Sequence, residues 1–172
     1  MALQDSYNTG DDVQQRVGNS NVTQEAQVFT ASGNYDLTSI KLKLYKESSA
    51  SGTFTCELKA VDGSSKPTGS ALSSGTLTQA DITSTAAPGA FYEFTMTAYS
   101  LVVSTQYAIV ARASTTAPND FWWRAEDGGT GFSDPGWQST DSGSSWADVG
   151  DDFMFEVYGT TIASFVPKLM QF

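Results

Sequence analysis

The side chains most suited to binding a ligand lie within residues 121–158. This stretch contains all four tryptophans of the chain, and it carries eight acidic residues against a single base. A flat indole face can cover the apolar side of a sugar ring while neighbouring polar groups bond its hydroxyls. The residues that could form such a glycan-binding platform are Trp122, Arg124, Trp137, Gln138 and Trp146. The alternative is that Trp123 and at least one loop tryptophan fill the end of the fold or contact another subunit.

The aspartates of the same stretch could hold a calcium ion. Carboxylate oxygens and loop carbonyls are the ligands that calcium prefers. The candidate metal ligands are Asp127, Asp134, Asp141, Asp148 and Asp151. Their spacing matches no EF-hand loop, and solvated surface acids are the alternative. The sequence requires no cofactor, and calcium is the metal that it allows.

Histidine is absent from the chain. Ser-His-Asp and Cys-His catalysis and histidine-ligated zinc are therefore excluded. A glycosidase needs two carboxylates at a fixed separation, but Glu93, Glu126 and Glu156 lie in alternating segments that place them on solvent faces. The phosphate-loop and dinucleotide motifs are also missing. We expect a protein that is not an enzyme.

The net charge of −10 disfavours two classes of partner. Nucleic acids and anionic membranes both recruit clusters of Lys and Arg, and the sequence has none. The single cysteine, Cys56, cannot form an intramolecular disulfide and is expected to be a small buried side chain. The first residues lack the basic start and apolar run of a secretory signal, and no stretch is long enough to insert in a membrane.

Alternating apolar residues predict an antiparallel β-sandwich or barrel of about eight to ten strands. Apolar side chains at every second position of residues 40–46, 54–60, 92–96 and 153–157 are typical of half-buried strands. The first two of these segments are joined by a short Ser/Gly loop, which predicts a hairpin. Residues 106–112 are apolar on both faces, as in a central strand. Residues 62–70 have the composition of a loop, and residues 78–81 could form one helical turn capped by Thr78.

We expect three parts: a polar N-terminal arm that could include one short edge strand (residues 1–25), the sandwich domain (26–159) and an apolar C-terminal tail (160–172). An apolar tail in water is costly. It either packs on its own sheet or docks on another subunit. The tail residues that could make subunit contacts are Ile162, Phe165, Val166, Leu169, Met170 and Phe172.

Several stretches, in order, resemble the choice-of-anchor R jelly-roll modules. They are residues 37–46, 62–63 with 67–70, 107–113, 123–124, 142–146 and 152–159, so the resemblance covers roughly residues 26–159. It implies a jelly roll of the kind found in prokaryotic surface proteins and phage structural proteins, similar to carbohydrate-binding sandwiches. It implies no catalytic residue. The sequence departs from the surface-anchored pattern in lacking a signal and a C-terminal anchor.

These observations favour a non-catalytic virion structural protein, such as a capsid-decoration or tail and fibre surface component. It would assemble with other virion proteins or with copies of itself, as a symmetric oligomer. A phage protein reaches the virion surface without a signal because the phage leaves the cell by lysis. The alternatives are a carbohydrate-binding module that contacts cell-surface glycan and an extracellular filament subunit.

Overall fold

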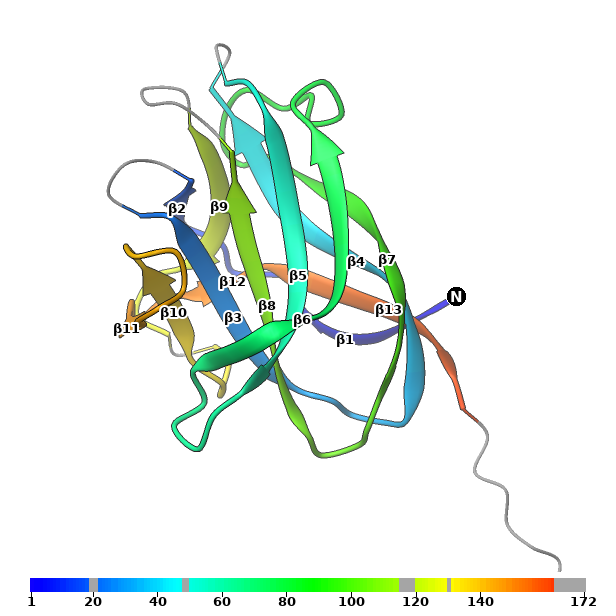
Figure 1. Ribbon diagram of the computed structural model, residues 1–172. Helices are drawn as coiled ribbons and strands as arrows, with labels where there is room; N and C mark the ends of the chain where they lie inside the picture. The colour runs from blue at the N-terminus through cyan, green and yellow to red at the C-terminus, as the bar shows by residue number, and fades with distance from the viewer. Residues whose placement is uncertain (19–21, 48–49, 115–119, 130, 163–172) are drawn as a thin grey trace, which may run out of the picture.

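The computed structural model describes residues 1–18, 22–47, 50–114, 120–129 and 131–162, and this part of the chain is built of strands without any helix (Figure 1). The seven-stranded sheet contains β1 (Ala2–Tyr7), β2 (Val13–Val17), β4 (Tyr35–Lys46), β7 (Ala90–Leu101), β9 (Phe121–Glu126), β12 (Asp152–Phe153) and β13 (Phe155–Thr161). The six-stranded sheet contains β3 (Gln24–Thr30), β5 (Thr53–Val61), β6 (Pro67–Thr78), β8 (Gln106–Ala113), β10 (Gly136–Ser139) and β11 (Ala147–Asp148).

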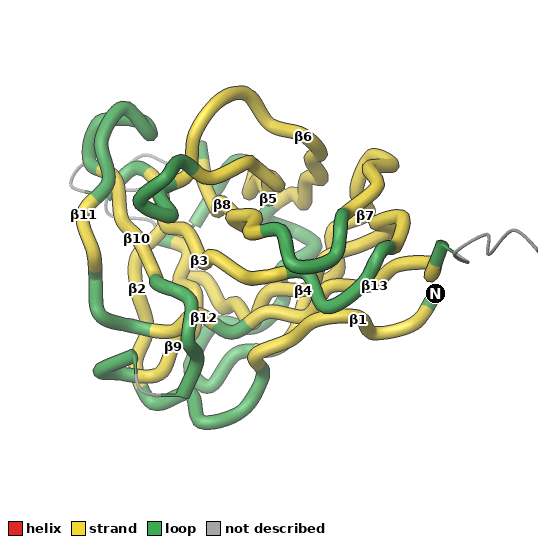
Figure 2. Tube along the Cα trace, turned by 90° about the horizontal axis from the view of Figure 1, so that it is seen from below, coloured by secondary structure: helices red, strands yellow, loops and turns green. Residues whose placement is uncertain are grey.

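The two sheets face each other, and their strand pairs are antiparallel (Figure 2). The predicted all-β antiparallel sandwich is therefore confirmed. The jelly-roll connectivity stays a prediction. The described residues form more strands than expected, because short strands lie in segments that had the composition of an arm or a loop. No helix that could span a membrane occurs in the described residues.

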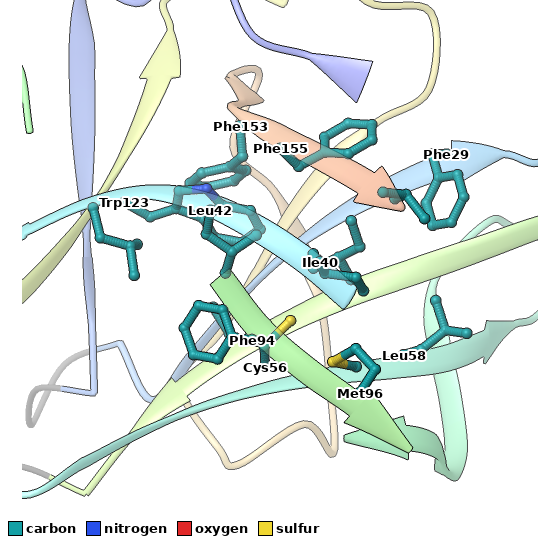
Figure 3. Close-up of a cluster of buried hydrophobic side chains, with 14 of the residues drawn as sticks. Phe29, Ile40, Leu42, Cys56, Leu58, Phe94, Met96, Trp123, Phe153 and Phe155 are labelled. Atoms are coloured by element: carbon teal, nitrogen blue, oxygen red, sulfur yellow. The ribbon is translucent and has the colours of Figure 1, made fainter. Parts of the chain in front are cut away.

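Alternation along each strand builds the core between the sheets. Ile40, Leu42 and Leu44 of β4 are fully buried, while Lys41 and Lys43 point to the outer face. Figure 3 shows side chains of both sheets meeting in this core, from Phe29 and Leu58 on one side to Ile40 and Phe155 on the other. Because all these side chains are apolar, their burial is the main contribution to the stability of the sandwich.

The core also contains the cysteine and one tryptophan. Cys56 is buried among apolar side chains, and burial raises the pKa of its thiol, with a smaller contribution from the charge of Glu57. Trp123 is fully buried and donates a hydrogen bond from its indole nitrogen to the carbonyl of Met154 at 2.8 Å. This bond satisfies the one polar group that the indole brings into the core.

The predicted hairpin between residues 40–46 and 54–60 is wrong. Strand β4 pairs with β7, β9 and β13, whereas β5 pairs with β6 and β8 in the other sheet. Residues 47–52 connect the two sheets. Two strands that face each other across a core bury every second side chain, as two paired strands do. The alternating pattern therefore indicated burial correctly and did not identify the partner.

The predicted N-terminal arm is corrected to strands of the sandwich. Strand β1 pairs with β13, strand β2 pairs with β9, and β3 begins at Gln24. Val17 is fully buried in the core, and Tyr7 and Val13 pack against it. Strands β1 and β2 each pair with one strand and bury few of their side chains, so these residues looked like a polar arm. At the other boundary, β13 extends to Thr161, beyond the expected end at residue 159.

Strand β8 has the predicted central position, between β3 and β5. Ile109 and Ala111 belong to the core, whereas Ala108 and Val110 form a second apolar cluster on the outer face of the six-stranded sheet. Trp137 and Trp146 complete this second cluster together with Ala26 and Val28 of β3. The segment from β10 to β11 thus covers the outer face of this sheet.

The edges of the two sheets meet at β6 and β7. The hydroxyl of Ser73 donates to the carbonyl of Thr97 at 2.5 Å, and the Thr97 hydroxyl donates to Ser73 Oγ at 3.1 Å. At Gly75, an added Cβ would lie 2.5 Å from the carbonyl oxygen of Thr95. Glycine is therefore required where the two backbones approach.

Strand β6 and the turn that follows it bear on two expectations, for residues 62–70 and for residues 78–81. The strand begins at Pro67, within the segment that had the composition of a loop, and it runs to Thr78. The backbone amide and the hydroxyl of Thr78 both donate to the Asp81 carboxylate at 2.7 Å. The amide of Asp81 also donates to the Thr78 carbonyl at 3.1 Å, so residues 78–81 form the expected single hydrogen-bonded turn, to which no helix is assigned.

Candidate binding groove

The four tryptophans occupy three separate places in the fold. Trp123 lies in the core, and Trp122 points from the same strand to the outer face of the seven-stranded sheet. Trp137 and Trp146 lie on the outer face of the opposite sheet. Gln138 follows Trp137 on β10, so its side chain points to the inner face. The structure does not bring the five predicted glycan-contact residues together.

Both flat faces of Trp122 are covered within the chain. Tyr45 of β4 stacks on the indole, with ring centroids 5.9 Å apart and planes 7° apart. The guanidinium carbon of Arg16 on β2 lies 4.7 Å from the indole centroid. Strands β4 and β2 pair with opposite edges of β9, so these two side chains flank Trp122 from opposite sides. No flat face of this ring remains for a sugar.

Arg124 is part of a charge network on the same outer face. Its Nε donates to the Asp11 carboxylate at 2.9 Å, and its side chain also bonds Gln14. Lys43 donates to the other carboxylate oxygen of Asp11 at 2.5 Å. Burial alone would raise the pKa of Asp11, but the hydrogen bonds and charges of Lys43 and Arg124 lower it below 3.8. The hydrogen bonds that Arg124 donates therefore hold β2 against β9. Trp146 lies on the outer face of the other sheet.

Three of the five predicted calcium ligands, Asp134, Asp148 and Asp151, line one cavity together with Asp152, whereas Asp127 and Asp141 do not line it. Asp134 accepts hydrogen bonds from side chains of β3 and β8 at 2.9 and 2.8 Å, and Asp151 accepts one from a glutamine of β2 at 2.5 Å. Asp148 accepts from a backbone amide two residues along the chain, and Asp127 is exposed. Within the described residues, no group of three or more acidic, cysteine or histidine side chains is placed to hold a metal ion.

The fifth of these residues, Asp141, shapes the turn before Trp146. Its carboxylate accepts hydrogen bonds from the amide and the hydroxyl of Ser145 at 2.8 and 2.6 Å, and from the hydroxyl of Ser139 at 2.8 Å. These bonds, with those of Ser145 as the main cause, lower the pKa of Asp141 to about 2. The carboxylate acts as the anchor of an ordered turn.

A groove of about 360 Å³ opens beside this turn on the outer face of the six-stranded sheet. One wall is the segment from β10 to β11, and the other is the turn between β5 and β6, which lies on the same side of the molecule in Figure 1. The groove is lined by Lys59, Asp62, Lys66, Thr68, Ser144 and Trp146, among others. Trp146 is 9 % exposed, so most of its indole is covered, and the remainder borders the groove.

The charges of the groove are arranged by the β5–β6 turn. Asp62 accepts hydrogen bonds from the backbone amides of Ser64 and Lys66 at 2.8 and 3.0 Å, which lower the pKa of its carboxyl. The ammonium nitrogen of Lys66 lies 5.2 Å from the centroid of the Trp137 ring, in a cation–π contact. The ammonium of Lys59 lies 3.6 Å from a carboxylate oxygen of Glu57. The groove therefore presents two lysines against one aspartate.

Sequence reasoning identified Trp146 and missed Lys59, Lys66 and Thr68. These residues lie on β5, in the following turn and on β6, which looked like a strand and a polar loop without function. They approach Trp146 because β10 pairs with β3, and β3 lies beside β8 and β5 in the sheet. No spacing in the sequence indicates this contact.

A buried carboxylate between the sheets was also missed. Ala26 and Val28 face outward on β3, so Glu25 points inward, and it is fully buried. Neither of its carboxylate oxygens accepts a hydrogen bond within the described part of the chain. Burial raises the pKa of Glu25 well above 4.5, and the charge of Asp151 raises it further. The surroundings of Glu25 therefore disfavour its ionised form.

Exposed apolar side chains gather at the end of the sandwich where β13 stops. Val102, Val103 and Ile162 are 54 %, 44 % and 40 % exposed. The backbone amides of Val103 and Ile162 donate to the side chain and the backbone carbonyl of Asn34 at 2.9 and 3.1 Å, so they lie around one turn. Leu3, on the neighbouring β1, is 47 % exposed. Of the predicted subunit-contact residues, only Ile162 is described; Phe165, Val166, Leu169, Met170 and Phe172 lie outside the described residues.

Comparisons of the chain with protein-family models, curated proteins and solved structures found no match.

Proposed function

We propose that this chain is a non-catalytic virion structural protein, a capsid-decoration or tail surface component that acts by assembling with neighbouring subunits. The observation that carries the proposal is the set of exposed apolar side chains Leu3, Val102, Val103 and Ile162, which we call the apolar end. It lies where the chain continues into the apolar residues 163–172. The resemblance to jelly-roll modules of phage structural proteins supports the same function.

The apolar end is suited to a contact between subunits. Valine, leucine and isoleucine gain free energy when a neighbour removes them from water, and contiguous exposed apolar residues mark such contacts. Outside this end, no other large apolar side chain of the described residues is more exposed than Ile162, apart from Met1 at the start of β1. A contact of one end with a neighbour, repeated by symmetry, would produce a ring or a filament.

Removal of residues 163–172 tests the proposal. We expect the full chain to associate or to enter particles, and the shortened chain to stay a folded monomer with the same circular-dichroism spectrum. Sedimentation velocity gives the mass, and negative-stain microscopy separates closed rings from the fibres expected of a filament subunit. A shortened chain that assembles as the full chain does would overturn the role of the tail.

Point variants test the apolar end separately from the tail. The double variant Val102→Ser, Val103→Ser should weaken association, because it replaces two exposed apolar side chains and no buried one. Ala71→Ser, at an exposed position of β6 on the other sheet, is the matched control and should associate like the unmodified chain. Equal association of both variants would contradict the proposal.

A second candidate function is carbohydrate binding, and the groove beside Trp146 favours it. The groove combines an aromatic edge with ammonium and hydroxyl groups, which is the combination that sugars require. A glycan array with the unmodified chain and Trp146→Ala tests this function. Trp122→Ala is the matched control, because both faces of Trp122 are covered by Tyr45 and Arg16. Loss of binding in the control and not in Trp146→Ala would refute the site.

A further inference from the structure

We propose that the groove beside Trp146 selects an acidic saccharide, a short sugar chain that carries carboxylate or sulfate groups, and that Lys66 recognises the negative charge. This inference rests on the carbohydrate-binding function proposed above as the second candidate. It goes further by naming the charge class of the ligand and the residue that determines it.

The dimensions and the walls of the groove suit a small ligand. Its volume of about 360 Å³ lies in the range of small-molecule sites, which is roughly 300–1,000 Å³. Asp141 fixes the wall that carries Trp146, and Asp62 fixes the wall that carries Lys66. Because both walls are held by hydrogen bonds within their own turns, a ligand does not have to order them on binding.

The groove contains basic side chains although the chain as a whole is acidic. The chain has a net charge of −10, yet two lysines and one aspartate line this groove. The ammonium of Lys59 lies 3.6 Å from a carboxylate oxygen of Glu57, and Glu57 also accepts a hydrogen bond from Arg112 at 2.9 Å. Lys59 is therefore already paired with an acidic residue of its own strand. The Asp62 carboxylate accepts hydrogen bonds from two backbone amides of its turn, and it also interacts with the charge of Lys66. Lys66 is therefore the cation that a ligand in the groove would meet.

The contact of Lys66 with Trp137 places its charge beside the aromatic cluster. The ammonium lies 5.2 Å from the ring centroid, and Trp137 and Trp146 belong to the same cluster. A sugar ring against the edge of Trp146 would carry its acidic group within reach of an ammonium that still has free donor capacity, since a cation–π contact uses no hydrogen bond. The Thr68 hydroxyl is available on the same wall for a sugar hydroxyl.

Two other cavities lack this combination. A cavity of about 410 Å³ is lined by Thr23, Gln24, Arg112 and their neighbours, without an aromatic ring. A cavity of about 220 Å³ is lined by Asp134, Asp148 and other acids, without a base. Of the three cavities, the groove beside Trp146 is the one with both an aromatic side chain and lysines.

The test compares acidic and neutral forms of the same sugars. Trigalacturonate and a chondroitin sulfate tetrasaccharide are titrated by isothermal calorimetry against their methyl-esterified and desulfated counterparts. We expect an acidic form to bind at least tenfold more tightly than its neutral counterpart, and to lose at least tenfold in affinity in Lys66→Gln, because a charge-assisted hydrogen bond is lost. Added salt should weaken the acidic form and not the neutral one.

Lys41→Gln is the matched control, because it removes the same charge from the outer face of the opposite sheet. Its affinity should equal that of the unmodified chain. If neutral and acidic forms bind equally, or if Lys66→Gln binds the acidic form normally, the charge inference fails while carbohydrate binding stands. If no acidic form binds, the inference is overturned, and the glycan array decides the broader function independently.

Discussion

Replacing the buried Glu25 with glutamine should change how stability depends on pH. In the folded chain Glu25 is fully buried without a hydrogen-bond partner among the described residues, and its pKa is raised by burial first and by Asp151 second. In the unfolded chain its pKa is near the ordinary 4.5. Below that pH both states carry the proton, and the ionisation of Glu25 does not affect stability.

Above pH 4.5 the unfolded state loses the proton while the folded state keeps it, so stability falls as pH rises until the raised folded pKa is passed. The slope is about 1.4 kcal/mol per pH unit for one group. At about 2–4 °C per kcal/mol for a chain of this size, the melting temperature should fall by roughly 3–6 °C per pH unit relative to Glu25→Gln.

The measurement is the difference in melting temperature between the two proteins, by tryptophan fluorescence at intervals from pH 5 to pH 8. Glutamine keeps the shape and, like protonated Glu25, is a buried polar side chain without a partner, so the two proteins differ by a cost that does not depend on pH. A constant cost shifts the curve of melting temperature against pH and does not change its slope. Glu93→Gln, at an exposed position of β7, is the control and should run parallel to the unmodified chain. If the Glu25→Gln curve is also parallel, our account of Glu25 is wrong.

Three further predictions follow from contacts in the sandwich. Asp11→Asn should destabilise the fold at pH 7 by about 3–5 kcal/mol, because it leaves Arg124 without its buried partner; the gap should close as the pH falls below 3.8, where the lowered pKa of Asp11 is reached. Gly75→Ala should cost about 1–3 kcal/mol in urea unfolding because its Cβ meets the β7 backbone, whereas Gly63→Ala, with open space, should be nearly neutral. Cys56 should react with a thiol reagent only in denaturant, since the native thiol is buried; labelling of the native chain would show that the core opens.

The predictable parts of the fold are the strands whose burial pattern is visible in their own sequence. Ile40, Leu42 and Leu44 alternate with polar residues, and the structure buries all three. Residues 106–112 are apolar on both faces, and β8 is covered on both. In these strands, each side chain is in the environment that its polarity requires, independently of the neighbouring strand.

The parts that were not predictable depend on which strands become neighbours. The alternation of β4 and β5 is the same whether they pair or face each other across the core. Trp122, Trp137 and Trp146 looked like one platform because they are close in sequence, but the turn of the chain between β9 and β10 sends them to opposite faces. Conversely, Lys66 and Trp146 are distant in sequence and line one groove.

The junction of β6 and β7 has a consequence for how copies of the chain could associate through their backbones. An unpaired outer strand can accept a strand from another molecule, and this is a common route to unwanted polymers. Here hydrogen bonds between Ser73 and Thr97 join the outer strands β6 and β7. The absence of a side chain at Gly75 lets the two backbones approach each other. Within the described residues, the outer strands left without such a contact between the sheets include β1, β2 and β11, each of which pairs with a single strand.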